Sequence, residues 1–167
     1  MIKTYLYDDE TKEMVTNLDL GDVHEKLRNP DNLLWIDLYD VHGQELAQIA
    51  KLFDFHPLAI EDCLHDSPRA KMDDYEDYKF FVFHALRYKE ESDDEITTLE
   101  LNAFVGSNYV VTIHKHKMGW LRKMDAVCSR YPKFMNRGAD FLLYAFIDGI
   151  TGEYFPNFSR IEQRIGE

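Results

Sequence analysis

The segment at residues 78–88 constrains the fold more than any other part of the sequence. Side chains alternate between the two faces of a β-strand, and in this segment both faces are largely apolar. The two faces carry Phe80 with Val82 and Phe81 with Phe83. A strand with two apolar faces has to be covered on both sides. The segment therefore predicts a sheet that is sandwiched between layers of helices.

Other apolar segments supply partners for this strand. The nearly continuous apolar run at residues 33–38 is typical of a central strand covered on both faces. Residues 96–105 and 109–113 follow the first segment closely and predict an antiparallel meander. Two shorter strands are expected at residues 2–7 and 13–16.

Helical patterns occupy the remaining parts of the chain. We expect Asp22 to cap a short helix that runs toward Arg28. A helical stripe at residues 45–53 and a helix opened by Pro57 follow before the meander, and the pattern is helical from about Met118 onward. The final residues are typical of the start of a long helix. We therefore predict an α/β fold with a mixed, partly antiparallel sheet between helices. The length of 167 residues suits a single domain, residues 1–167.

The amino-acid composition limits the classes of binding partner and the cellular compartment that we expect. With 31 acidic and 19 basic side chains, the formal net charge of −12 disfavours nucleic acid and anionic membrane surfaces and favours cations. Cys63 and Cys128 form no Cys-x-x-Cys pair, so we expect buried, reduced thiols. No stretch approaches the roughly 18 apolar residues of a membrane helix, and the first residues do not form a signal peptide. We expect a soluble chain.

Two adjacent carboxylates, Glu61 and Asp62, are candidate metal ligands on the helix that Pro57 opens. Successive helical residues are about 100° apart, so the two side chains point to neighbouring faces, and His65 can contact either. One interpretation is a solvated helix edge with a local acid–histidine contact. The other is a pair of oxygen ligands for a divalent cation. We expect His56, before the proline, to cap or pack locally rather than to bind metal.

Two other classes of function compete with cation binding. His114 and His116 lie at the end of a predicted strand with both imidazoles on one face, and such a pair can ligate a transition metal in a hydrolase. No nucleophile elbow or phosphate-binding loop accompanies them, and we expect no enzymatic activity. The acidic loop at residues 90–95 is typical either of a solvated turn or of a contact with a basic protein partner.

The order of several motifs resembles the amino-terminal cytoplasmic domain of the CorA family of magnesium and cobalt transport proteins. These motifs are LWIDL at 34–38, HPLAIED at 56–62, YEDYKF at 75–80, VGSNYVVT at 105–112 and ADFLLYAFID at 139–148. Ala70 departs from the family's usual Arg-Pro-Lys run. The family's stalk helix, two membrane helices and Gly-Met-Asn signature do not occur in these residues. We expect an isolated sensing domain that does not itself conduct ions.

The resemblance implies metal sites shared between subunits. It implies a pentamer whose cytoplasmic domains, at the cytoplasmic face of the cell membrane, bind Mg²⁺ between subunits and hold the pore closed when the cation is abundant. By motif, Asp62 resembles the carboxylate of the first interface site, while Glu61 and Asp148 resemble ligands of the second. The partner carboxylates come from a neighbouring stalk helix, so Mg²⁺ should bind the isolated domain weakly. Co²⁺, Ni²⁺ and Zn²⁺ remain open as the physiological ion.

Overall fold

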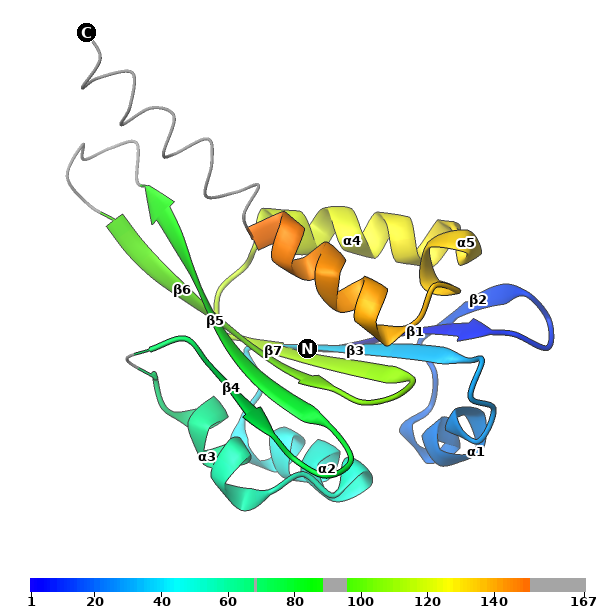
Figure 1. Ribbon diagram of the computed structural model, residues 1–167, viewed down its shortest axis with the longest axis horizontal. Coiled ribbons are helices and arrows are strands. Elements are labelled where there is room, and N and C mark those ends of the chain that lie inside the picture. The colour runs from blue at the N-terminus through cyan, green and yellow to red at the C-terminus, as the bar shows by residue number, and fades with distance from the viewer. Residues whose placement is uncertain (68, 89–95, 151–167) are drawn as a thin grey trace, which may run out of the picture.

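Seven strands form one mixed sheet in the order β2-β1-β3-β7-β6-β5-β4 (Figure 1). The computed structural model describes residues 1–67, 69–88 and 96–150. β3 and β7 pair in parallel, and the other described pairs are antiparallel. The strands are β1 (Ile2–Asp8), β2 (Glu13–Thr16), β3 (Leu33–Tyr39), β4 (Lys71–Asp74), β5 (Lys79–Tyr88), β6 (Ile96–Val105) and β7 (Tyr109–His114).

Helices cover both faces of this sheet (Figure 1). The α3 layer contains η1 (Leu20–Asp22), α1 (Val23–Leu27), α2 (Gly43–Phe53) and α3 (Pro57–Leu64). The α4 layer contains α4 (Gly119–Arg130), α5 (Pro132–Met135) and a helix at residues 139–150. The predicted α/β sandwich with a mixed sheet is therefore confirmed. The expected start of a long terminal helix extends into residues 151–167, which lie outside the described residues.

Each face of the sheet buries its own apolar cluster. Under the α4 layer, Trp35 stacks on Tyr5 with ring centroids 4.5 Å apart and contacts Phe146 at 5.0 Å. Under the α3 layer, Phe55 stacks on Phe104 at 3.8 Å. β3 contributes buried side chains to both clusters, as its continuous apolar run predicts.

Two details differ from the sequence expectation. β4 forms an edge strand paired with β5, although its sequence, KMDD, has no apolar alternation. Charged residues are common on edge strands because they oppose further pairing. The first short helical segment is capped by Asp19, whose carboxylate accepts a hydrogen bond from the backbone N of Gly21 at 2.9 Å. Asp22 occupies the N-cap position of the following helix, α1, as expected, but its side chain makes no capping hydrogen bond.

Both cysteine thiols are free and buried, as expected. Burial raises the pKa of the Cys128 thiol to about 12, so the thiol stays protonated near neutral pH. No helix within the described ranges has the length and apolar character needed to cross a membrane. The acidic loop at residues 90–95 lies outside the described residues.

Candidate metal-binding carboxylates

Local hydrogen bonds fix the position of α3. The His56 Nδ1 accepts a hydrogen bond from the backbone N of Leu58 at 3.1 Å, so His56 caps the helix as predicted. The backbone N of His56 donates to the Tyr78 hydroxyl at 2.7 Å. Ala59 and Cys63 face the sheet and are buried. Glu61 therefore lies on the outer, exposed part of the helix surface.

Asp62 already has a cationic partner within the chain. The Lys71 Nζ lies 2.6 Å from the Asp62 Oδ2 and 3.1 Å from the Asp73 Oδ2, so one ammonium group links α3 to β4. The hydrogen bond to Asp62 is the main cause of a raised Lys71 pKa, with a further contribution from Asp73. The Lys71 and Asp62 side chains are about one-third exposed. Ion pairs this exposed contribute about 0–1 kcal/mol to the free energy of unfolding. The ammonium group occupies the space between the two carboxylates.

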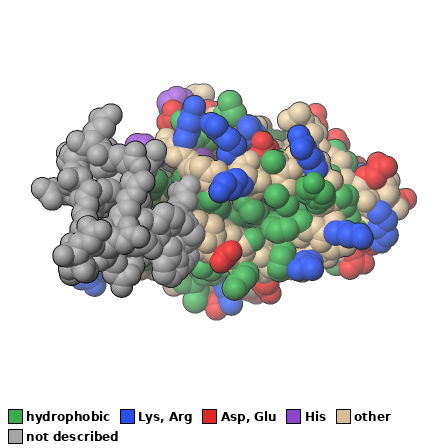
Figure 2. Space-filling view, turned by 90° about the horizontal axis from the view of Figure 1, so that it is seen from above, with side chains coloured by type: hydrophobic (Ala, Val, Ile, Leu, Met, Phe, Trp, Pro, Cys, Tyr) green, Lys and Arg blue, Asp and Glu red, His purple; other side chains and the backbone are tan. Residues whose placement is uncertain are grey.

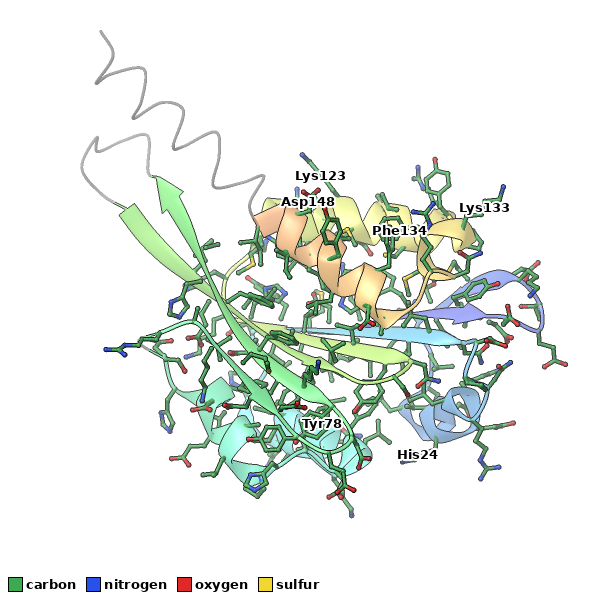
Figure 3. All side chains as sticks on the ribbon, in the orientation of Figure 1. His24, Tyr78, Lys123, Lys133, Phe134 and Asp148 are labelled. Atoms are coloured by element: carbon green, nitrogen blue, oxygen red, sulfur yellow. The ribbon has the colours of Figure 1, made fainter. Side chains whose placement is uncertain are left out.

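Asp148 lies on the other side of the molecule. Figure 3 shows it on the 139–150 helix in the α4 layer, with the sheet between it and the α3 layer. Asp148 and Glu61 are both exposed, and neither forms an ion pair within the described residues. The chain thus brings Glu61 and Asp62 together and holds Asp148 apart from them. Within the part of the chain that the structure describes, no three His, Cys, Asp or Glu side chains are grouped to hold a metal ion.

His114 belongs to a buried network rather than to a histidine pair. Its Nε2 lies 2.9 Å from the Asp37 Oδ1, and its Nδ1 lies 2.7 Å from the backbone carbonyl of His116. Thr112 also donates to the Asp37 Oδ1, at 2.7 Å. Burial lowers the pKa of His114, but the hydrogen bond and charge of Asp37 outweigh that effect and the net shift is upward. Because both ring nitrogens face acceptors, His114 is not free to bind a metal beside the exposed His116.

The partners of two candidate residues were missed in the sequence. Lys71 follows Asp62 by nine positions and reaches it only because β4 folds back beside α3. Asp37 had a visible signal, since it is an acid inside the apolar run of a central strand. An acid that is only 13% exposed requires a hydrogen-bonding partner, which the sequence alone did not identify.

Comparisons with known proteins agree with the family resemblance that the sequence motifs indicate. A family model described as "CorA-like Mg2+ transporter protein" matches residues 30–167. Putative metal ion transporter YfjQ of Bacillus subtilis (strain 168) is 35% identical over 144 residues, which cover 86% of this chain and 44% of that relative. Cobalt/magnesium transport protein CorA of Methanocaldococcus jannaschii is 27% identical over 137 residues, which cover 81% of this chain and 42% of that relative. The chain spans less than half the length of these relatives.

Solved structures share the fold. The soluble domain of CorA from Methanocaldococcus jannaschii matches with a TM-score of 0.73 at 22% identity, covering 99% of this chain and 62% of that one. The ZntB cytoplasmic domain from Vibrio parahaemolyticus matches with a TM-score of 0.70 at 11% identity, covering 95% of this chain and 62% of that one. At these identities the likeness shows the fold alone. The two relatives are named as transporters, in agreement with the expectation that the chain is not an enzyme.

Proposed function

The chain belongs to the CorA-like Mg²⁺ transporter family, and on that premise we propose that it is the cytoplasmic, cation-sensing domain of a divalent-cation transporter. Mg²⁺ bound between copies of the domain favours the closed pore in this proposal. The ligands are Glu61, Asp62 and Asp148, as the family motifs imply. Mg²⁺ is the first choice of ion, because a similar protein from Methanocaldococcus jannaschii is named as a cobalt/magnesium transport protein.

One surface pattern, present on both acid-bearing helices, supports the proposal. On α3, Leu58 is 61% exposed and precedes Glu61 and Asp62 by three and four positions. On the 139–150 helix, Tyr144 is 66% exposed and precedes Asp148 by four. Residues with these spacings lie on the same side of a helix. Each helix therefore presents an exposed apolar side chain beside a carboxylate, a combination typical of a contact surface.

The two surfaces lie on opposite layers of the sandwich (Figure 1). An ion held by both Glu61 and Asp148 must therefore join the α3 layer of one copy to the α4 layer of the next. Such a head-to-tail contact generates a ring when the rotation between copies closes. This geometry is compatible with the pentamer that the family resemblance implies. Figure 2 shows apolar side chains gathered on the outer face of the α4 layer, where the second half of the contact would lie.

Charge also favours a head-to-tail arrangement. Residues 54–77, around α3 and β4, carry eight acidic and two basic side chains. Residues 115–137, around α4 and α5, carry seven basic and one acidic side chain. Opposite charges on the two contact surfaces steer association and exclude other orientations. Copies joined α3 layer to α4 layer would bring these segments towards each other.

The carboxylates of Glu61 and Asp148 are the exception to this charge complementarity, because both are negative. A cation is therefore needed between them. Two carboxylates about 4 Å apart repel by roughly 4 kcal/mol at an effective dielectric constant near 20. Mg²⁺ takes oxygen ligands, keeps several waters and turns that repulsion into attraction. Lys71 already neutralises part of the charge of Asp62. The effect of Mg²⁺ should therefore be greatest where Glu61 of one copy approaches Asp148 of the next.

Protease protection of the oligomeric transporter tests the proposal. Protection of the cytoplasmic domains should rise with Mg²⁺, and the double variant Glu61→Gln, Asp148→Asn should need at least about tenfold more Mg²⁺ for the same protection. The matched control is Glu76→Gln with Asp140→Asn, two exposed acids of the same regions. An unchanged Mg²⁺ dependence in the first double variant would reject these carboxylates as the sensing ligands.

A further inference from the structure

A polar cluster interrupts the apolar face of the sheet beneath the end of α3. His84 on β5 pairs directly with Glu100 on β6, and Asn102 lies two residues further along the same face of β6. Val82 and Phe104, on the same faces of these strands, belong to the apolar cluster under the α3 layer. The polar side chains line a cavity of about 360 Å³, together with Asp66, Ser67 and His116.

The hydrogen bonds around Glu100 fix the orientation of its neighbours. The Glu100 Oε1 accepts from the backbone N of Ser67 at 2.9 Å and lies 3.3 Å from the His84 Nε2. The Glu100 Oε2 accepts from the Asn102 Nδ2 at 3.4 Å. Reversing the Asn102 amide would place its oxygen against the carboxylate, so the observed orientation is the favourable one.

This orientation leaves one buried acceptor without a partner. Asn102 is 3% exposed, and its Oδ1 makes no hydrogen bond in the described structure. Buried polar atoms in folded proteins nearly always have a partner, because desolvating them without one is unfavourable. The missing partner of an amide oxygen is either a hydrogen-bond donor or a cation. The side chains around the same cavity distinguish between these two.

The spacing of the cluster suits a metal ion. Two ligands that each lie about 2.1 Å from an ion are roughly 3.0–3.4 Å apart at octahedral or tetrahedral angles. The 3.3 Å between the His84 Nε2 and the Glu100 Oε1 falls in that range. Asn102 adds an amide oxygen from the same face of β6. The cluster thus combines two ionisable ligands, His84 and Glu100, with one amide ligand, Asn102.

We propose that this cavity binds a first-row transition-metal ion, of which Co²⁺, Ni²⁺ and Zn²⁺ are the candidates, through His84, Glu100 and Asn102. An imidazole ligand favours these ions over Mg²⁺, which prefers oxygen ligands alone. Water molecules complete the coordination. The site is separate from Glu61, Asp62 and Asp148 and does not depend on their proposed role. Because Ser67 follows α3 and donates to Glu100, an ion here would tie the end of α3 to the sheet.

Titration of the untagged chain with Co²⁺ tests the site, using visible absorption and calorimetry. The wild type should bind one Co²⁺ in this cavity, with Mg²⁺ at least about tenfold weaker. His84→Gln and Glu100→Gln should each weaken Co²⁺ binding at least about tenfold. His24→Ala removes an exposed histidine on α1 and should change nothing (Figure 3). Circular dichroism verifies that each variant is folded.

A gain-of-function variant keeps the test decisive if a ligand variant fails to fold. Asn102→Asp places a carboxylate where the unpartnered oxygen lies, so it should bind Co²⁺ more tightly and show a larger Co²⁺-dependent rise in Tm than the wild type. The double variant Glu61→Gln, Asp148→Asn should retain Co²⁺ binding, which separates this site from the proposed Mg²⁺ site. No Co²⁺ uptake by the wild type at about 1 mM would overturn the proposal. Unchanged binding in both ligand variants would do the same.

Discussion

α3 and the 139–150 helix present similar outer surfaces but are held to the sheet in different ways. The inner side of α3 buries two small side chains, Ala59 and Cys63. The inner side of the 139–150 helix buries Leu142, Phe146 and Ile150. Large apolar side chains contribute about 1.5–3 kcal/mol each on burial, so the second helix has much the stronger apolar anchor.

Polar contacts compensate in part on the α3 side. Tyr78 accepts a hydrogen bond at the start of the helix, and Lys71 binds its carboxylate at Asp62. Contacts of this kind can be exchanged for others at little cost, whereas a packed aromatic side chain cannot move without leaving a cavity. We therefore expect α3 to be the element that shifts when an ion binds, and the 139–150 helix to act as the fixed side of the contact.

Truncating the apolar anchor should have the largest effect. Phe146 is fully buried against Trp35 and Trp120, so Phe146→Ala should lower the free energy of unfolding by about 3–5 kcal/mol. Cys63→Ala, on the inner side of α3, should lower the free energy of unfolding by only about 1 kcal/mol. Urea unfolding of both variants measures the difference. Equal losses would show that the two helices are anchored equally and would remove the basis of the comparison.

Close packing of the 139–150 helix predicts a second, smaller effect. A Cβ at Gly149 would lie 2.8 Å from the Trp120 Cε3, so the tryptophan ring must shift to admit it. We expect Gly149→Ala to lower the free energy of unfolding by about 1–3 kcal/mol, despite the better helix propensity of alanine.

The matched control lies in the α3 layer. A Cβ at Gly43, the first residue of α2, meets nothing within 4 Å. Gly43→Ala should therefore be neutral or stabilising by up to about 1 kcal/mol. Thermal unfolding of both variants would refute the packing argument if the two substitutions had the same effect.

The sequence predicted the elements that periodic burial creates. Apolar patterns in the sequence predicted β3, α2 and the meander of β5, β6 and β7. These patterns are visible because the apolar side chains of these elements are buried in the two clusters. β4 has no such pattern, because an edge strand of four residues contributes mainly backbone hydrogen bonds. The family motifs marked Glu61, Asp62 and Asp148 as candidate ligands, and these roles stay predictions.

The partners of the polar residues were not predictable, because tertiary pairing sets them. His114 meets Asp37 across 77 positions, through the parallel pairing of β3 with β7. In the sequence, Asn102 is simply one polar residue in a predicted strand. Only the packing around it shows that its Oδ1 has no hydrogen-bond partner. Local periodicity carries no information about such pairs.

The polar tie at the start of α3 predicts an effect of intermediate size. Tyr78→Phe keeps the buried ring but leaves the backbone N of His56 without its acceptor, so it should cost about 1–2 kcal/mol. Amide hydrogen exchange in α3 should accelerate more than in α4. Tyr144→Phe removes an exposed hydroxyl on the opposite layer and should change stability by less than about 0.5 kcal/mol. Equal acceleration in both helices would contradict the conclusion that Tyr78 holds α3 locally.

Removing the cationic partner of Asp62 should have the smallest effect on stability and should act chiefly on ion affinity. Lys71→Met leaves Asp62 and Asp73 facing each other across the space that the ammonium held, at a cost below about 1 kcal/mol. Mg²⁺ should then bind α3 roughly two- to fivefold more tightly, since that ion pair no longer competes with it. Mg²⁺-dependent NMR shifts of the Asp62 and Asp73 amides measure this, with Lys123→Met on α4 as the control. If those shifts follow the same Mg²⁺ dependence in both variants, the lysine does not compete with the ion, and the difference between α3 and the 139–150 helix is one of anchoring alone.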